Sequence, residues 1–512
     1  MGPIRRIACI AALTAFIAVI GCSGRPDAAN PSIDRLFAEW NKPDAPGCSV
    51  GVTRNGTVIY EHGYGLANLE LRVPLSPASV LAAASISKQF TAFSILLLAH
   101  RGLLSLDDDV SKYVSGWEDH GTRITIRQLL SHTSGLREAF VLQGLRPEHP
   151  DNINQQIVSV LAHARGLNFV PGSQFEYNNS AYTLLAAIVA RSAGQTFAQF
   201  TDANIFKPLG MSHSRFRDDA TRVIPDVATP YIRKPDGFHV ALNTLTNVVV
   251  GNDDLFTTVG DLLRWEESFA DLRVGDAAIL REMETPVIST GWPDGSQYAF
   301  GLEIADHRGL RRIEHGGGDD GVSSYVVRYP ERGLAIAILC NRDDIGAEAI
   351  TRSIAEVVLE GDFPAPPPAS PPPVQPLSLS VQSLQDKVGV YRDISDGSVG
   401  RVFIRDRALI AAGSDGGEYP LTPIAPTRFT IPGTAVIAEF VPPVGNTPQE
   451  LRVSGAGPAV RISRQTAPFA PSHEELRHSR EPTRATRSTV PTRLSRVMRI
   501  WCCACRRARM WR

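Results

Sequence analysis

Apolar and polar residues follow two different periods in the first 361 positions of this 512-residue chain. Residues 49–60 alternate around Asn55-Gly56, which predicts a β-hairpin. Helical spacing dominates from Ser85 to about Leu280. Strands at both ends with helices between them predict a mixed α/β domain over residues 33–361, in which one sheet carries a helical insertion. The other predicted strands are 298–304, 311–314, 322–329 and 334–340, and the terminal helices are 33–40 and 347–359.

The remainder of the chain has a different composition. Residues 362–378 are predicted to form a Pro-rich linker, because positions 364–376 hold eight prolines and cannot pack as a regular element. Short alternating runs with turn residues between them predict a small β domain, a barrel or a sandwich, over residues 379–466. This pattern then stops, and residues 467–512 are predicted to be a disordered basic tail, to which we assign no function.

The N-terminus has the features of an export signal. Two arginines precede an apolar run over residues 7–20, which is too short to cross a bilayer comfortably. The run ends in V-I-G-C, which resembles the bacterial lipobox. That resemblance implies a signal peptide over residues 1–21 and lipid attachment at Cys22, and a plain cleaved signal is the alternative. We therefore expect a lipid-anchored protein of the bacterial periplasm, on the outer membrane rather than the inner one.

Net charge and cysteine usage narrow the class of protein. The formal net charge is −1, so no overall field recruits nucleic acid, and no nucleic-acid partner is predicted. Only two of the seven cysteines, Cys48 and Cys340, lie in the predicted α/β domain, where an oxidising compartment would permit a disulfide. His and Cys do not occur at the spacing of a zinc site, so neither a metal nor a cofactor is predicted.

The segment A-S-I-S-K at positions 84–88 places a serine three residues before a lysine at the start of an apolar helix. Residues three apart share a helix face, so Lys88 can reach back to Ser85. Serine is a poor nucleophile without a base, and a lysine can act as that base once burial lowers its pKa. A capping serine beside a solvent-reaching lysine is the structural alternative, since S-x-x-K alone is a common pattern.

A second segment, F-E-Y-N-N-S at positions 175–180, supplies a Y-x-N pattern. The phenol of Tyr177, if close to Ser85 and Lys88, can pass a proton to a leaving group. The amide of Asn179 can donate to a substrate carbonyl. Y-x-N is a weak signal alone, and an ordinary buried aromatic is the alternative for Tyr177.

A third segment consists of a predicted strand that ends at His315 and is followed by three glycines. The glycines, Gly317 and Gly318 among them, would let the backbone of a substrate approach closely. A backbone N–H of this run and that of Ser85 could together form an oxyanion hole.

In this order, the three segments resemble the motifs of the β-lactamase and penicillin-binding-protein superfamily. The resemblance is strongest to the branch that contains class C β-lactamases, D-alanyl-D-alanine carboxypeptidases and esterases. It covers about residues 33–361, where L-L-S-H-T-S-G-L at 129–136 also looks familial. It implies an antiparallel sheet flanked by terminal helices and joined to an all-helical lobe. The family sheet would also place Cys48 near Cys340, and a bridge requires Cα atoms within about 7 Å.

The same resemblance implies a role for each motif residue. Ser85 would be the nucleophile, and Lys88 and Tyr177 would share the proton transfers. Substrate binding would fall to Asn179, His315, Gly317 and Gly318.

His315 departs from the family pattern, because the family's K-T-G motif has a lysine there that attracts a substrate carboxylate. A histidine is mostly neutral at pH 7, given its reference pKa of about 6.5. Esters and uncharged amides are therefore favoured as candidate substrates over β-lactams and peptides.

The sequence thus predicts a serine hydrolase that forms an acyl-enzyme on an ester or amide in the bacterial envelope. D-amino-acid peptides and β-lactams are further candidate substrates, and the membrane is reached through the N-terminal lipid. A non-catalytic envelope protein of the same fold, which binds peptidoglycan or a partner, is the alternative. The intact set of Ser85, Lys88 and Tyr177 speaks against it. A third hypothesis gives the main task to the C-terminal β domain, which has no aromatic cluster for a glycan.

Three other features are predicted to be structural. The run at 316–321 matches G-x-G-x-x-G, but a strand follows it where a dinucleotide site needs a helix. Asp107, Asp108 and Asp109 have no matching metal ligands and are predicted to lie in a solvated loop or cap. His132 lies among capping residues and is also predicted to be structural.

Overall fold

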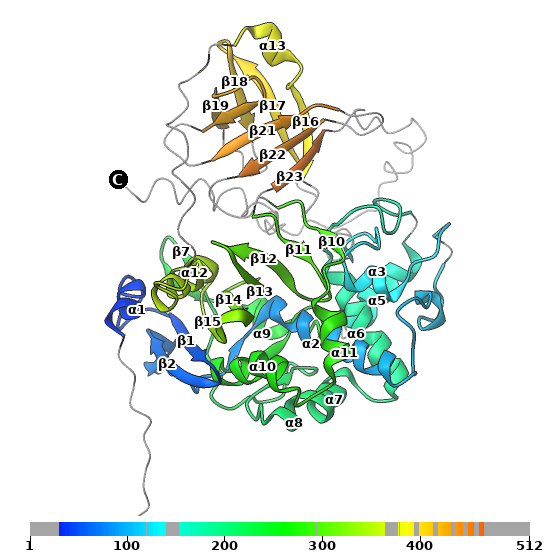
Figure 1. Cartoon of the computed structure of the whole chain (residues 1–512), viewed down its shortest axis with the longest axis vertical. Helices are drawn as coiled ribbons and strands as arrows, with labels where there is room; N and C mark the ends of the chain where they lie inside the picture. Colours follow the sequence, from blue (N-terminus) through cyan, green and yellow to red (C-terminus); the bar gives the residue numbers. More distant parts are fainter. Residues whose placement is uncertain are drawn as a thin grey trace, which may run out of the picture.

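The fold is that of a computed structural model, in which two domains follow one another along the chain (Figure 1). The predicted signal peptide, Cys22, most of the linker and the basic tail lie outside the described residues. Among the residues that are described, no helix is long and apolar enough to cross a membrane. The structure describes residues 30–464 except 119, 140–152, 165, 293, 364–376, 378, 394–398, 413–417, 432–435, 444–448 and 455–459.

An eight-stranded antiparallel sheet forms the centre of the first domain, with the order β10-β11-β12-β13-β14-β15-β1-β2. In the sequence, β1 is the first strand of this sheet and β15 is the last. The two pair with each other inside the sheet, as the family resemblance implied. The strands are β1 (Cys48–Arg54), β2 (Thr57–Tyr64), β10 (Ile288–Ser289), β11 (Gln297–Tyr298), β12 (Glu303–His307), β13 (Leu310–Asp319), β14 (Val322–Tyr329) and β15 (Leu334–Cys340).

Two strands differ from the sequence prediction. The predicted strand 298–304 is two strands, β11 and β12, because Gly301 turns the chain with a φ of +70°. The glycine run after His315 does not end its strand, since β13 continues through it to Asp319. Within that run Gly317 pairs with Ser324 of β14, so the glycines are part of the sheet. The hairpin at Asn55-Gly56 is confirmed.

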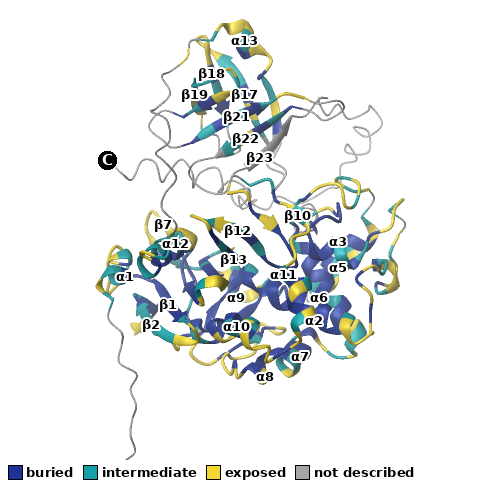
Figure 2. Ribbon diagram, viewed as in Figure 1, coloured by how far each residue is buried: buried dark blue, intermediate teal, exposed yellow. Residues whose placement is uncertain are grey.

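Helices cover the sheet and fill the insertion. The terminal helices α1 (Pro31–Leu36) and α12 (Ala347–Val358) pack together on one side, and α10 (Val259–Asp271) packs on β1 and β15. Figure 2 shows α2 and α6 of the insertion as mostly buried. The other helices are α2 (Ser87–His100), α3 (Ile126–Leu130), α5 (Ile153–His163), α6 (Asn179–Ala193), α7 (Phe197–Thr201), α8 (Lys207–Leu209), α9 (Leu242–Thr246) and α11 (Ala277–Glu284).

Short elements lie in the connections between these strands and helices. The 3-10 helix η1 (Ala84–Ile86) leads directly into α2, and the other short helices are η2 (Val110–Lys112), η3 (Asp202–Phe206) and η4 (Pro330–Arg332). The short strands are β3 (Leu66–Asn68), β4 (Val73–Pro74), β5 (Leu81–Ala82), β6 (Arg215–Phe216), β7 (Tyr231–Lys234), β8 (Gly237–Val240) and β9 (Leu255–Thr257).

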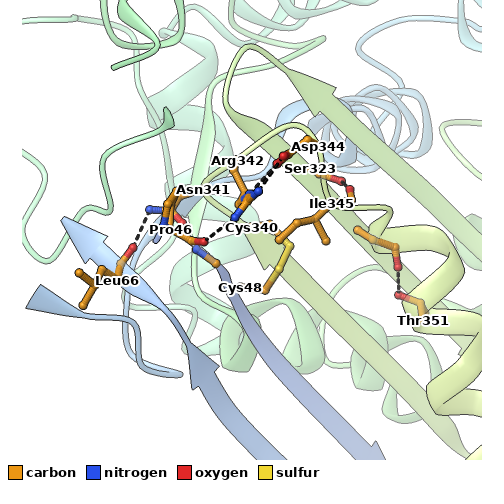
Figure 3. Close-up of a disulfide and its surroundings, with 12 residues drawn as sticks. Pro46, Cys48, Leu66, Ser323, Cys340, Asn341, Arg342, Asp344, Ile345 and Thr351 are labelled. Atoms are coloured by element: carbon orange, nitrogen blue, oxygen red, sulfur yellow. Dashed lines mark hydrogen bonds and ion pairs between the residues drawn. A yellow bond between two sulfur atoms is a disulfide. The ribbon is translucent and has the colours of Figure 1, made fainter. Parts of the chain in front are cut away.

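A disulfide joins β1 and β15, which are the first and last strands of the sheet in the sequence. Cys48 lies opposite Cys340 in the register of β1 and β15, and the two form a disulfide with Cα atoms 4.0 Å apart (Figure 3). Both residues are fully buried. The following residue, Asn341, donates hydrogen bonds to Leu66 O and Thr229 O and so ties this end of β15 to the insertion. The predicted proximity and bridge are confirmed.

The second domain is a closed β-barrel, which decides between the barrel and sandwich predictions. Each strand pairs antiparallel with the next, and β16 closes the barrel on β23. Its interior is packed with side chains such as Tyr391, Phe429 and Phe440. Figure 1 shows it beyond the β10–β12 edge of the sheet. Its elements are α13 (Val381–Gln385), β16 (Gly389–Asp393), β17 (Val399–Arg405), β18 (Ala408–Ala412), β19 (Glu418–Pro423), β20 (Arg428–Thr430), β21 (Ile437–Val441), β22 (Glu450–Ser454) and β23 (Val460–Arg464).

Candidate active site

Ser85 lies on a tight turn between β5 and α2. Ala84 before it has a φ of +48°, a conformation that costs a residue with a Cβ some free energy and that its neighbours must enforce. Ser324 of β14 donates a hydrogen bond to Ala83 O at 2.7 Å, and Ser87 accepts one from the backbone N–H of Leu255. The turn is thus held from two strands, and Ser85 stays half-buried at the start of α2.

Lys88 is fully buried one turn along the same helix, with its side chain directed at Ser85. Its Nζ atom lies 2.9 Å from Ser85 Oγ, 2.8 Å from Asn179 Oδ1 and 3.0 Å from Asn252 O. None of these three partners is a carboxylate. The predicted reach from Lys88 to Ser85 is therefore present in the fold.

Burial sets the protonation of Lys88. Desolvation disfavours the charged ammonium and lowers the pKa of Lys88 to about 7, although the charges of Asp253 and Glu138 oppose that change. An amine with a pKa near neutrality is unprotonated in a large fraction of molecules at pH 7. Lys88 can therefore accept a proton under ordinary conditions, which a surface lysine cannot do.

Tyr177 closes the other side of Ser85. Lys88 Nζ lies 4.9 Å from the centre of its ring, and its hydroxyl is close enough to Ser85 to affect the pKa of Tyr177. Burial raises the pKa of Tyr177 well above its usual value, and the interaction with the hydroxyl of Ser85 opposes this only in part. The phenol thus keeps its proton at neutral pH and is suited to donate one.

The start of α6 holds the Y-x-N segment in place. Asn178 caps the helix by accepting a hydrogen bond from Ala181 N–H, and its amide donates to Leu136 O. Glu138 accepts the backbone N–H of Asn179 at 2.7 Å. These contacts direct the side chain of Asn179 toward Lys88, so Asn179 joins the cluster that the sequence predicted.

The glycines of β13 lie directly against the turn of Ser85. A Cβ atom on Gly317 would approach Ala83 O to 2.4 Å and the Cβ of Ala84 to 3.1 Å, so a side chain there would push the strand off the turn. Gly318 is exposed, and a Cβ there would meet nothing within 4 Å. The space beside Gly318 is therefore open, one residue beyond the glycine that lies against the turn of Ser85.

His315 is buried, and both of its ring nitrogens have protein partners. Nδ1 lies 2.7 Å from Gly316 O, and Nε2 lies 3.1 Å from the hydroxyl of Tyr298. Burial, followed by the charge of Lys88, lowers the pKa of His315 to about 3. The ring is neutral at pH 7, and both of its nitrogens are engaged by protein groups, so its predicted contact with substrate stays a prediction.

The structure adds residues that the sequence did not single out. Asn252 contributes through its backbone oxygen, which no sequence motif can reveal. Tyr298 is the first residue of a predicted strand and was assigned no role, and His132 was predicted to be structural. The ring of His132 packs on Tyr177, with ring centres 4.4 Å apart. In the described ranges, no three His, Cys, Asp or Glu side chains are grouped so that they could hold a metal ion.

Comparison with known proteins places this arrangement in a family. A family model described as Beta-lactamase matches residues 33–359. Penicillin-binding protein 4* of Bacillus subtilis (strain 168) is 28% identical over 415 residues, which cover 77% of this chain and 89% of that protein.

Two solved structures share the fold. The octameric penicillin-binding protein homologue from Pyrococcus abyssi has a TM-score of 0.60 at 22% identity and covers 84% of this chain and 98% of its own. D-amino acid amidase from Ochrobactrum anthropi SV3, complexed with L-phenylalanine, has a TM-score of 0.55 at 21% identity, over 65% of this chain and 100% of its own. Since the family model spans more than half of the sequence, the chain belongs to the Beta-lactamase family, a group of serine hydrolases with the fold of β-lactamases and penicillin-binding proteins.

Proposed function

We propose that this protein hydrolyses an ester or an amide through an acyl-enzyme on Ser85. The hydrogen bonds of Lys88 carry the proposal. A neutral amine has two N–H groups and one lone pair. The oxygen atoms Asn179 Oδ1 and Asn252 O can only accept hydrogen bonds, so each accepts one of the two N–H groups of Lys88. The lone pair is then left for the hydroxyl of Ser85, which is a base aligned with a nucleophile.

The same contacts support an order of proton transfers. Ser85 Oγ attacks the substrate carbonyl and gives its proton to Lys88, while backbone N–H groups of Ser85 and Gly318 stabilise the oxyanion. As the intermediate collapses, Tyr177 protonates the leaving group and is reprotonated from Lys88. Water then releases the acid by the reverse sequence. Lys88 is the first acceptor because Tyr177 retains its phenolic proton, as its raised pKa requires.

The neutral His315 favours uncharged substrates. A fixed cation at this position would select carboxylates, and His315 supplies none at pH 7. Simple esters and amides are therefore proposed first. The relatives, a penicillin-binding protein and a D-amino acid amidase, add D-amino-acid amides, D-peptides and cephalosporins to the substrates worth screening.

We also propose that the protein works in the bacterial periplasm, anchored through a lipid on Cys22. The V-I-G-C segment after the apolar run supports this location. Incorporation of an alkyne-tagged palmitate should be lost in Cys22→Ala, and the protein should then leave the membrane fraction. Unchanged membrane attachment of this variant would refute the lipid anchor.

The rival proposal is a binding protein that has kept the fold without the chemistry. A binding module has no need for a lysine that is buried without a carboxylate contact, since such burial costs stability. The site of Ser85, Lys88 and Tyr177 therefore favours catalysis.

Covalent labelling with a fluorophosphonate tests the proposed function. Wild-type protein should be labelled on Ser85, as identified by peptide mass, and Ser85→Ala should not be labelled. Ser94→Ala is a matched control, because Ser94 is buried on α2 and its hydroxyl donates to Phe90 O within the same helix. It should be labelled at the wild-type rate. A well-folded wild-type protein that is not labelled would support the binding role.

A further inference from the structure

His132 holds the segment that carries Tyr177 from both sides. Its backbone oxygen accepts the N–H of Glu176 at 2.9 Å, and its ring Nδ1 accepts the N–H of Asn178 at 3.0 Å. His132 itself is fully buried and has a φ of +56°, which a residue with a side chain adopts at a cost. A backbone forced into this conformation to direct a ring at Tyr177 points to a role beyond filling space.

The hydrogen-bond partners fix where the protons lie on both histidines. Because Nδ1 of His132 accepts from a backbone N–H, its Nε2 must carry the proton, and Nε2 lies 3.2 Å from the hydroxyl of Tyr298. The carbonyl of Gly316 can only accept, so Nδ1 of His315 carries the proton and Nε2 is left as an acceptor. Tyr298 therefore receives a hydrogen bond from His132 and donates one to His315.

A second hydroxyl in contact with Tyr298 does not change this assignment. Tyr182 also approaches Tyr298, but it donates its own proton to Leu130 O at 2.6 Å. Tyr298 thus has two possible acceptors, an imidazole nitrogen of His315 and a phenol oxygen of Tyr182. The imidazole nitrogen is the stronger base and takes the proton.

We propose that His132 and Tyr298 are positioning residues for Tyr177. The hydroxyl of Tyr298 links the rings of His132 and His315 and holds them in opposite tautomers, and this link fixes Tyr177 against strand β13. This chain of hydrogen bonds joins the Y-x-N segment to the glycine strand without touching the nucleophile. The effect of this chain on catalysis rests on the proposed function, whereas the tautomers of the two histidines can be tested without it. His315 then serves as the anchor of β13 in the site and not as a base or a donor to substrate.

The surroundings support two permanently neutral rings. Burial lowers the pKa of His132 well below its usual value, and it also lowers that of His315. The amine of Lys88 faces both rings, and its charged form lowers both pKa values further.

Nitrogen-15 NMR of the histidine rings tests the tautomers in the full-length protein. We expect one buried ring protonated on Nε2 and one on Nδ1, both unchanged between pH 6 and pH 8. Tyr298→Phe should shift only these two rings. Tyr329→Phe is the matched control, since it removes another buried Tyr–His hydrogen bond, to His307, and should shift only that ring. Two rings with the same tautomer, or titration of either ring in this range, would overturn the proposal.

Kinetics test the positioning role. Tyr298→Phe and His132→Asn should each lower kcat for an ester about 10-fold with little change in KM, because small displacements of reacting groups slow catalysis strongly. Asn tolerates the backbone conformation, and its Oδ1 can still accept the N–H of Asn178, so this variant keeps that hydrogen bond while it removes the link to Tyr298 and the ring that packs on Tyr177. The double variant should be no slower than either single one. Tyr329→Phe should keep kcat within twofold.

The outcomes separate this inference from the proposed function. If Ser85 is labelled and the variants react at the wild-type rate, or if their effects are additive, the positioning role is wrong while the hydrolase remains. If wild-type Ser85 is never labelled, the proposed function fails, and the NMR tautomers still decide whether the chain of hydrogen bonds exists.

Discussion

Two buried basic side chains of the α/β domain, Lys88 and Arg328, have opposite surroundings. Arg328 on β14 contacts two carboxylates, Glu266 of α10 and Glu284 of α11, each at 2.6 Å, and its guanidinium lies 3.8 Å from the ring centre of Phe269. Lys88 contacts two carbonyl oxygens and a hydroxyl. The first arrangement compensates a charge that arginine cannot lose, whereas the second favours loss of the charge.

This difference distinguishes a cation with a structural role, Arg328, from an amine that can act as a base, Lys88. A buried charge that is paired holds elements together, and here it joins β14 to two helices. A buried amine without a carboxylate contact loses its proton more easily and becomes a base. The comparison makes predictions that change one region at a time, and they are given from the largest expected effect to the smallest.

Removal of the amine of Lys88 should have the largest effect. Lys88→Met keeps an apolar stem of similar length and lacks the base, so the labelling rate of Ser85 should fall about 10²- to 10⁴-fold. Lys88→Arg should fail as well, because its guanidinium keeps its proton. Labelling rates of folded protein measure both. An active Lys88→Arg would show that positive charge, and not a free base, is what the site requires.

Removal of the paired cation should affect stability and not activity. Arg328→Met leaves Glu266 buried without its partner, so the free energy of unfolding should fall by about 3–5 kcal/mol. Denaturant unfolding measures this loss, and the labelling rate of the protein that remains folded should not change. The additional change Glu266→Gln should recover part of the loss. A slower labelling rate with intact stability would mean that Arg328 belongs to the reactive region.

Removal of the charge of Glu138, which acts on Lys88 from a distance, should have the smallest effect. The carboxylate of Glu138 raises the pKa of Lys88 against the effect of burial. Glu138→Gln removes this charge and keeps an oxygen that can accept the N–H of Asn179. The midpoint of the pH–rate profile should therefore move to lower pH, by less than one unit. A shift to higher pH would contradict the assignment of the midpoint to Lys88.

The sequence predicted the fold and the motif residues because both depend on local pattern. Alternation gave the hairpin at Asn55-Gly56, and motif order gave Ser85, Lys88, Tyr177 and Asn179, which the fold brings together. It did not predict that β13 continues through its glycines, because their pairing with β14 and the close approach of Gly317 to Ala83 are tertiary contacts.

The contacts of His132 and Asn252 were also beyond the sequence. The contact of Asn252 uses a backbone oxygen, and the partners of His132 come from segments 46 and 166 residues away. Such contacts follow from tertiary packing and leave no local pattern.

The pH dependence of Ser85 acylation tests the central claim most directly. If Lys88 is the base and its pKa is about 7, the second-order rate of fluorophosphonate labelling should fall about tenfold per pH unit below pH 7 and level off above it. Burial lowers this pKa from about 10.5, so the active form is the deprotonated one and activity is lost toward acid. A rate that still rises steeply between pH 8 and pH 10 would mean that Lys88 remains protonated in the fold and would contradict the account.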